Sequence, residues 1–186
     1  LAAALVAGRL GLSGATPQSI LAAQHKLHAT RVLQQVAPDA NLRFTSLNAG
    51  DDTLVPGELD YPVFVKPVKG AFSVLARRIE EPDQLRAHMR FGRPERWLIR
   101  QLVEPFERVC RARLPQAGSA YRMLLEEPVA PQTPQFNLDG WVRNGRVHAL
   151  GVVDAVMYPG TQAFMRWEHT SRLGAAAQHR LDPGQE

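Results

Sequence analysis

An Asn-Gly pair at 144–145, between two runs of apolar residues, constrains the fold of this 186-residue chain more than any other feature. Both central positions of a two-residue type I′ turn need a positive φ angle, and Asn-Gly is a preferred pair there. The sequence therefore predicts an antiparallel hairpin with strands at 136–142 and 147–153. A further strand is expected at 164–167.

Helix signals dominate the first 111 residues. The Thr-Pro pair at 16–17 predicts a helix start, because threonine caps helices and proline is tolerated at the first helical position. Apolar residues at helical intervals predict that this helix runs from 18 to 36. Two more helices are expected at 82–89 and 97–111, the second one kinked or split by Pro105.

Short strands are interspersed irregularly among these helices. They are expected at 42–44, 61–65, 72–79 and 121–125. The apolar opening segment 1–12 lacks the basic region of a signal peptide and is interpreted as a helix that ends near Gly11. Because helices and hairpins intermix without regular strand–helix alternation, the sequence predicts an α+β fold and not a doubly wound α/β fold.

Composition excludes several classes of protein. No apolar run approaches the roughly 20 residues that cross a bilayer, so no membrane span is expected. The single cysteine, Cys110, excludes an internal disulfide framework and a cysteine-based zinc cluster, and it indicates a reducing, cytoplasmic location. Its place on an apolar stripe indicates packing and not a nucleophile. The motifs of triad hydrolases and zinc enzymes are absent.

The net charge of +4 comes from 22 basic and 18 acidic residues. Most of the basic residues are arginines scattered among acids, which is typical of a solvated surface and argues against a nucleic-acid interface. A non-enzymatic basic module that binds RNA or another anionic partner stays open as an alternative. Only Lys26, Lys66 and Lys69 are lysines, so their positions carry more information than the net charge.

The strongest local signal is VFVKPVKGAFSV at 63–74. An apolar strand delivers Lys66, and a turn that contains Gly70 and Ser73 leads into the next strand. A phosphate needs a fixed cation and close backbone N–H donors, which a glycine permits because it has no side chain. Lys66 suits phosphate oxygens, and Ser73 adds a hydroxyl donor. The alternative is an ordinary hairpin with a lysine at its mouth.

A second candidate is the acidic strand end Glu126-Glu127-Pro128-Val129. An extended segment that is stiffened by proline can offer one carbonyl and one N–H to the edge of an adenine, beside apolar side chains. The competing interpretation is an acidic surface loop.

Other polar residues have simpler interpretations. Lys26 could equally lie on a helix surface. The nearby His25 and His28, which have no third ligand in the sequence, are interpreted as exposed or core-edge histidines. The i,i+4 pair Glu107 and Arg111 predicts solvated charges on a helix face.

Taken in order, these stretches resemble the ATP-grasp superfamily of ATP-dependent ligases, which includes D-alanine–D-alanine ligases, biotin carboxylases and amino-acid ligases. The matching stretches are LGLSGATPQSILAAQHKLHATRVLQ, YPVFVKPVKGAFSV, LLEEPV and FNLDGWVRNGRVHALGVVD. The resemblance implies two α+β subdomains of mainly antiparallel sheet with helices. It places the tail of a preceding domain at 1–15, the first subdomain at 16–120 and an incomplete second subdomain at 121–186.

The resemblance also implies phosphate-binding residues. Lys26 and Lys66 match the two lysines that reach the phosphates of ATP. Gly70 and Ser73 match the flexible glycine-rich loop that closes over the β- and γ-phosphates.

The adenosine end is implied in the same way. Glu126 and Val129 match the hinge whose backbone meets the adenine edge, and Glu127 lies beside it. Family members often place an acid or a histidine on the ribose a few residues later, where this chain offers only Gln132 or Gln135.

The activity implied by the resemblance is a ligase reaction. ATP phosphorylates a small-molecule carboxylate to an acyl phosphate, which an amine or a similar nucleophile then attacks. Arg166 and Arg172 match basic groups that such enzymes place near the transferring phosphate or the acceptor.

The family also uses Mg²⁺, which an acid and a Glu-x-Asn pair hold after the hairpin. Downstream of 168 the chain offers only Asp182 and Glu186 as acids, and no asparagine follows Asn144. No metal ligand is therefore assigned in the chain, and the ligands are expected beyond its C-terminus. The chain is expected to be a fragment that binds ATP and is inactive alone.

Overall fold

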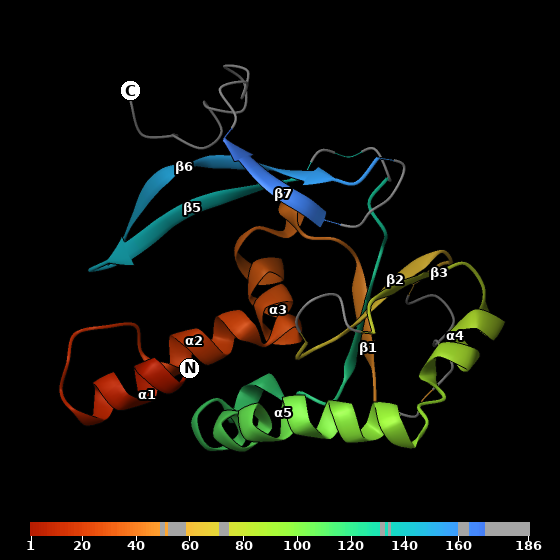
Figure 1. Cartoon of the computed structure of the whole chain (residues 1–186), viewed down its shortest axis with the longest axis horizontal. Coiled ribbons are helices and arrows are strands. Elements are labelled where there is room, and N and C mark those ends of the chain that lie inside the picture. The colour runs from red at the N-terminus through yellow and green to blue at the C-terminus, as the bar shows by residue number, and fades with distance from the viewer. Residues whose placement is uncertain are drawn as a thin grey trace. The chain divides into compact units, whose positions relative to one another are not determined.

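The computed structural model describes residues 1–48, 51, 59–70, 75–130, 133, 135–159 and 164–169 (Figure 1). They belong to two compact units, Leu1–Pro128 and Val129–Glu186. The limits predicted from the sequence, with subdomains at 16–120 and 121–186, stay a prediction.

The first unit begins with α1 (Ala2–Arg9), α2 (Pro17–Gln24) and α3 (Lys26–Val36). As predicted, Thr16 caps α2, because its side chain accepts a 3.1 Å hydrogen bond from the Ser19 N–H. The single helix predicted at 18–36 is wrong, since the chain breaks at His25. The backbone there is extended, and the His25 side chain caps α3.

Two further helices follow in the same unit. Helix α4 (Pro82–Met89) has the predicted bounds, and α5 (Arg93–Arg113) is longer than predicted. Pro105 lies inside α5 and does not split it. Short 3₁₀ turns occupy Pro38–Ala40 and Pro115–Ala117.

The four strands of the first unit form an antiparallel sheet in the order β1-β4-β2-β3. These strands are β1 (Phe44–Leu47), β2 (Val63–Pro67), β3 (Arg77–Ile79) and β4 (Met123–Glu126). The strand expected at 42–44 lies two to three residues later, at β1. Only 77–79 of the strand expected at 72–79 is a strand, and 71–74 fall outside the described residues.

The two faces of this sheet pack against different helices. On one face, buried side chains of all four strands form a core with Leu85 and Met89 of α4. On the other face, Leu124 of β4 packs against Leu27 of α3 and Val68. A separate core joins α2, α5 and the turn that follows α5. The first unit is therefore a sheet covered by helices on both faces.

The second unit is a three-stranded antiparallel sheet in the order β5-β6-β7, built from β5 (Phe136–Arg143), β6 (Arg146–Met157) and β7 (Phe164–His169). Asn144 and Gly145 have φ angles of 51° and 75°, which confirms the predicted type I′ hairpin. A register shift at Asp139/Gly140 fits the closeness of the strands there, since a Cβ on Gly140 would lie 2.4 Å from the facing His148 carbonyl oxygen.

Helices and antiparallel sheets without strand–helix alternation confirm the predicted α+β class. Within the described part of the chain, no helix combines the length and the apolar character that a membrane span requires.

Candidate functional site

Lys66 lies on the sheet face that α3 covers, and it forms an ion pair with Glu126 across β2 and β4. Phe64 pairs with Glu126 in the register, so Lys66, two residues after Phe64, lies on the same face as Glu126 and diagonal to it. The side chains are 26% and 11% exposed. The sheet therefore presents one fixed ammonium group beside one fixed carboxylate.

Lys26 reaches the same region from α3. As the first residue of that helix, it donates its backbone N–H to the Val68 carbonyl at 3.2 Å, and its Nζ donates to the Gly70 carbonyl at 2.8 Å. Burial, followed by the nearby charges of Lys66 and Lys69, lowers the pKa of the Lys26 ammonium group. The structure thus brings together Lys26, Lys66 and Gly70, which lie up to 44 residues apart in the sequence.

Lys69 belongs to the same cluster and was not assigned a role from the sequence. Its Nζ donates to Gln24 Oε1 at 2.9 Å and lies 4.6 Å from the centroid of the Phe106 ring. Burial lowers the pKa of its ammonium group. The scarcity of lysine was the signal that could have identified it, since two of the three lysines lie within four residues.

His25 fixes the position of Lys26, the residue that follows it. The prediction of an exposed or core-edge histidine is wrong, because the ring is fully buried. Its Nδ1 accepts a 3.2 Å hydrogen bond from the His28 N–H, so Nε2 carries the proton and donates to the Gly118 carbonyl at 3.3 Å. Burial lowers the pKa of this ring, which favours the neutral form.

Gly70 meets Lys26 where the chain leaves β2. A Cβ on this residue would lie 3.3 Å from Pro67 Cγ, so a larger residue would crowd the turn. Ser73, the second residue predicted for the loop, lies outside the described residues.

In the predicted hinge, the side chains of Glu126 and Glu127 at the end of β4 bind different partners. The Glu126 carboxylate is bound to Lys66, whereas the Glu127 carboxylate accepts a 3.2 Å hydrogen bond from Arg43 Nη1. The backbone N–H of Glu127 donates to the Arg43 carbonyl at 3.0 Å and is therefore already used. Val129 is exposed and begins the second unit.

Two more predicted residues lie in the second unit. The Gln135 carbonyl accepts a 2.9 Å hydrogen bond from the Ala155 N–H, and Arg166 pairs with Glu168 on β7. Gln132 and Arg172 fall outside the described residues. The roles of Gln135 and Arg166 stay predictions.

Magnesium does not fit the residues gathered at the lysines. Among the residues that the structure describes, no three His, Cys, Asp or Glu side chains form a group that could hold a metal ion. A cluster of ammonium groups with one carboxylate repels a divalent cation instead of binding it.

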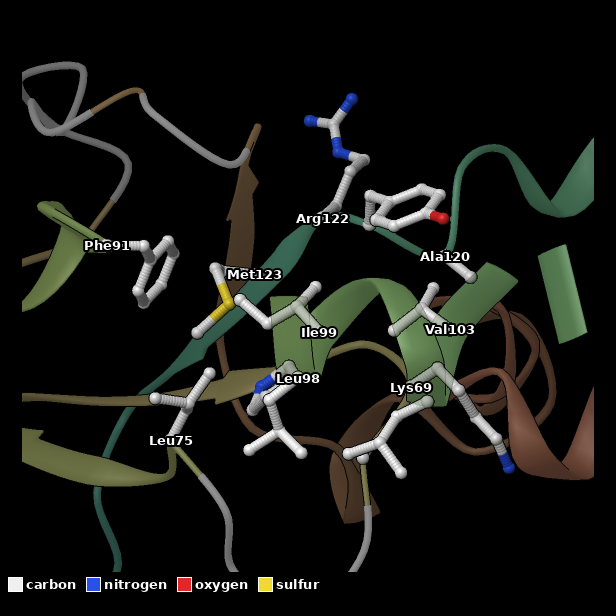
Figure 2. Close-up of a pocket in the computed structure, with 13 residues that line it drawn as sticks. Lys69, Leu75, Phe91, Leu98, Ile99, Val103, Ala120, Arg122 and Met123 are labelled. Atoms are coloured by element: carbon white, nitrogen blue, oxygen red, sulfur yellow. The ribbon is translucent and has the colours of Figure 1, made fainter. Parts of the chain in front are cut away.

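A shallow pocket that is open to solvent lies between α5, the end of β2 and the start of β4 (Figure 2). Figure 2 shows Ile99 of α5 pointing toward Met123, whereas the Arg122 side chain points away from both. Arg122 Nη2 donates instead to the Ser46 carbonyl at 2.8 Å. The walls of the pocket are mainly apolar, and Lys69 and Gly70 of the lysine cluster form part of its lining.

Glu107 on α5 is a buried carboxylate, so the prediction of a solvated charge is wrong. It is 3% exposed, and its Oε2 accepts a 2.7 Å hydrogen bond from the Ala120 N–H, while Oε1 accepts one from Arg111 Nε at 2.7 Å. The bond to Ala120 joins α5 to the segment that enters β4. Cys110 is buried nearby, and its burial raises the pKa of the thiol, as the predicted packing role requires.

Solved structures resemble this chain, although no family model matches the sequence and no curated protein matches it. L-amino acid ligase from Bacillus licheniformis aligns with 97% of this chain and 36% of its own length, with a TM-score of 0.61 and 19% identity. D-alanyl-alanine synthetase A from Vibrio cholerae O1 biovar eltor aligns with 95% of this chain and 50% of its own length, with a TM-score of 0.57 and 14% identity.

Both solved structures are ATP-grasp ligases. The similarity confirms the ATP-grasp fold that the sequence motifs predicted. The chain spans half or less of each of these two proteins.

Proposed function

We propose that this chain binds the phosphates of ATP and forms part of an ATP-dependent ligase. The observation that carries the proposal is the convergence of Lys26, Lys66 and Gly70 at one end of the sheet, from two segments far apart in the sequence. Ammonium groups held by a sheet and by a helix start supply the fixed positive charge that phosphate oxygens need.

The contacts of the two lysines indicate how each would act. Lys66 is held in place by Glu126, so its ammonium group is already oriented when a phosphate arrives. Lys26 is bound to a neutral carbonyl, and a phosphate oxygen would be a stronger acceptor because the hydrogen bond is then charged at both ends. The phosphate would also relieve the repulsion between the lysines that lowers the pKa of Lys26.

The adenosine end would lie along the hinge. Since the Glu127 N–H is bonded to the Arg43 carbonyl, the hinge would offer the adenine edge the backbone of Glu126 and the Val129 N–H. Gln135 would contact the ribose, as the family resemblance implies.

The reaction proposed for the whole enzyme is the activation of a small-molecule carboxylate. ATP would convert the carboxylate to an acyl phosphate, and an amine or a similar nucleophile would displace the phosphate. Arg166 and Arg172 would lie near the transferring phosphate or the acceptor. The Mg²⁺ that neutralises phosphate charge in such reactions would need ligands outside this chain, so we propose that the chain is inactive alone.

The alternative of a basic module that binds RNA gains no support from the described residues. Several arginines of both units pair with acidic side chains, as Arg78 does with Glu80 and Arg166 with Glu168, and each such pair reduces the positive charge that a phosphate backbone would require.

Titration of a fluorescent ATP analogue tests the proposal. We expect the wild-type chain to bind it and Lys66→Ala to bind at least about tenfold more weakly, since a hydrogen bond to a charged group is lost. Arg96→Ala removes one cation from the exposed surface of α5 and is the matched control, with affinity unchanged. Equal binding by Lys66→Ala, or no binding by the wild-type chain, contradicts the proposal.

A further inference from the structure

The two lysines that the motifs assign to phosphates are not alone. Lys69 follows Lys66 by three residues and directly precedes Gly70, whose carbonyl accepts a 2.8 Å hydrogen bond from Lys26 Nζ. Burial lowers the pKa of Lys26, and the nearby charges of Lys66 and Lys69 lower it further. All three lysines of the chain therefore gather around the turn at Gly70, although 19 of its 22 basic residues are arginines.

The charge in this cluster is not balanced by the protein. Glu126 forms an ion pair with Lys66. Within the described ranges, no acidic side chain pairs with Lys26 or Lys69, whose ammonium groups donate to the neutral oxygens of Gly70 and Gln24. Three ammonium groups with one carboxylate leave a local excess of two positive charges.

Such an excess is unfavourable in the free protein. Like charges held close together repel, and burial removes part of the water that would screen them. A bound anion offsets both effects, and two surplus charges suit an anion whose charge extends over several phosphoryl groups.

From this arrangement we propose that Lys69 is a third anion-binding residue, and that the cluster of Lys26, Lys66 and Lys69 recognises a linear polyphosphate chain. The inference rests on the proposed phosphate-binding function and adds a residue to that site.

The contacts of Lys69 in the free protein would allow its ammonium group to move toward a bound anion. Its ammonium group rests on the Phe106 ring and on Gln24, an exposed residue at the end of α2. Both partners are uncharged, and the lysine stem is long and has several rotatable bonds. Exchange of the Gln24 oxygen for a phosphoryl oxygen replaces a bond that is charged on one side by a bond charged on both.

Binding of inorganic tripolyphosphate to the full 186-residue chain, measured by calorimetry, tests the role of Lys69 without any contribution from adenine. We expect Lys69→Gln to weaken binding about 10- to 100-fold, because a hydrogen bond between two charged groups is lost. Arg96→Gln makes the same change in net charge on the exposed surface of α5 and should leave the affinity unchanged. Wild-type affinity in Lys69→Gln overturns the inference.

A second variant separates anion binding from a structural role. Gln24→Ala removes the neutral acceptor that holds Lys69, so it should tighten tripolyphosphate binding about two- to tenfold, the net value of an exposed hydrogen bond to an uncharged acceptor. If Lys69 acted only by tying α2 to the turn, Gln24→Ala would weaken binding as Lys69→Gln does, and an unchanged or weaker affinity overturns the inference. This variant also carries the test if Lys69→Gln does not fold.

The two proposals fail in different ways. If Lys66→Ala loses the ATP analogue while Lys69→Gln binds tripolyphosphate as the wild type does, the third site is wrong and the proposed function stands. If the wild-type chain binds neither probe, both are wrong.

Discussion

The ion pair between Lys66 and Glu126 predicts a strong coupling that a double-mutant cycle can measure. Lys66→Met removes the ammonium group and leaves a nearly buried carboxylate without its partner. Breaking a buried pair on one side costs about 3–5 kcal/mol. Because the Lys66 side chain is 26% exposed, water screens part of the interaction, and we expect a loss of about 1–3 kcal/mol.

The double variant Lys66→Met/Glu126→Leu should recover most of that loss. Apolar side chains of similar size need no partner, and they extend the apolar surface that Leu124 begins on the same face. We expect the double variant to lie within about 1 kcal/mol of the wild type, so the separate losses of Lys66→Met and Glu126→Leu should add up to more than the loss of the double variant.

Urea unfolding followed by helical circular dichroism is the assay. The described helices all lie in the first unit, so their signal reports on the unit that contains the pair. If the double variant loses as much stability as the two single variants added together, the groups are not coupled, and the reasoning about the pair is refuted. The ATP analogue provides a second readout, since the stable double variant should still bind it more weakly than the wild type.

Three further predictions concern the supports of the site and the second unit. Burial lowers the pKa of His25 below its unfolded value near 6.5, so the stabilising effect of the neutral ring is present above that pH and is lost on acidification through the lower folded-state pKa. The melting temperature of a His25→Asn variant should therefore fall less steeply below neutral pH than that of the wild type. An unchanged slope contradicts this prediction. Glu107→Ala should lower the free energy of unfolding in urea by about 2–3 kcal/mol, since the buried Ala120 N–H loses its acceptor. Arg111→Ala removes the exposed partner of Glu107 and should lower it clearly less. Equal losses would contradict a dominant role of the bond to Ala120. Gly140→Ala should destabilise the second unit, because its Cβ would lie 2.4 Å from the His148 carbonyl oxygen, whereas Gly151→Ala should not, because a Cβ there meets nothing within 4 Å. Limited proteolysis of the hairpin distinguishes the two variants. Equal cleavage rates would contradict this prediction.

Local signals in the sequence were sufficient for the elements that depend on local chemistry. The Asn144-Gly145 turn needs two positive φ angles, and both are present in the structure. Helix α4 has the bounds that its Glu-Pro entry predicted. The break at His25 was missed because apolar residues continue at helical intervals across it. What ends α2 there is a tertiary contact, the bond from the buried ring to Gly118, which lies 93 residues away.

The candidate site could be predicted only in part for the same reason. Motif order selected Lys26, Lys66 and Gly70, and the structure brings these three together. The partner of Lys66 could not be predicted, because it depends on the register between β2 and β4. The buried state of Glu107 was missed because a sequence shows its helical neighbour Arg111 but not the N–H of Ala120, which approaches from a later segment.

The strand order of the first unit has a consequence for how the protein folds during synthesis. Strand β4 lies between β1 and β2, yet it is the last of the four to leave the ribosome, and Phe44 pairs with Glu126 across more than 80 residues. Residues 44–79 therefore cannot complete their sheet until residue 126 has emerged, and β1 and β2 expose unpaired edges until then. When β4 inserts, the sheet closes and Glu126 reaches Lys66 in the same step. The sheet face that carries Lys66 and Glu126 is thus complete only when β4 is in place, so the proposed phosphate site cannot form on a partly synthesised chain.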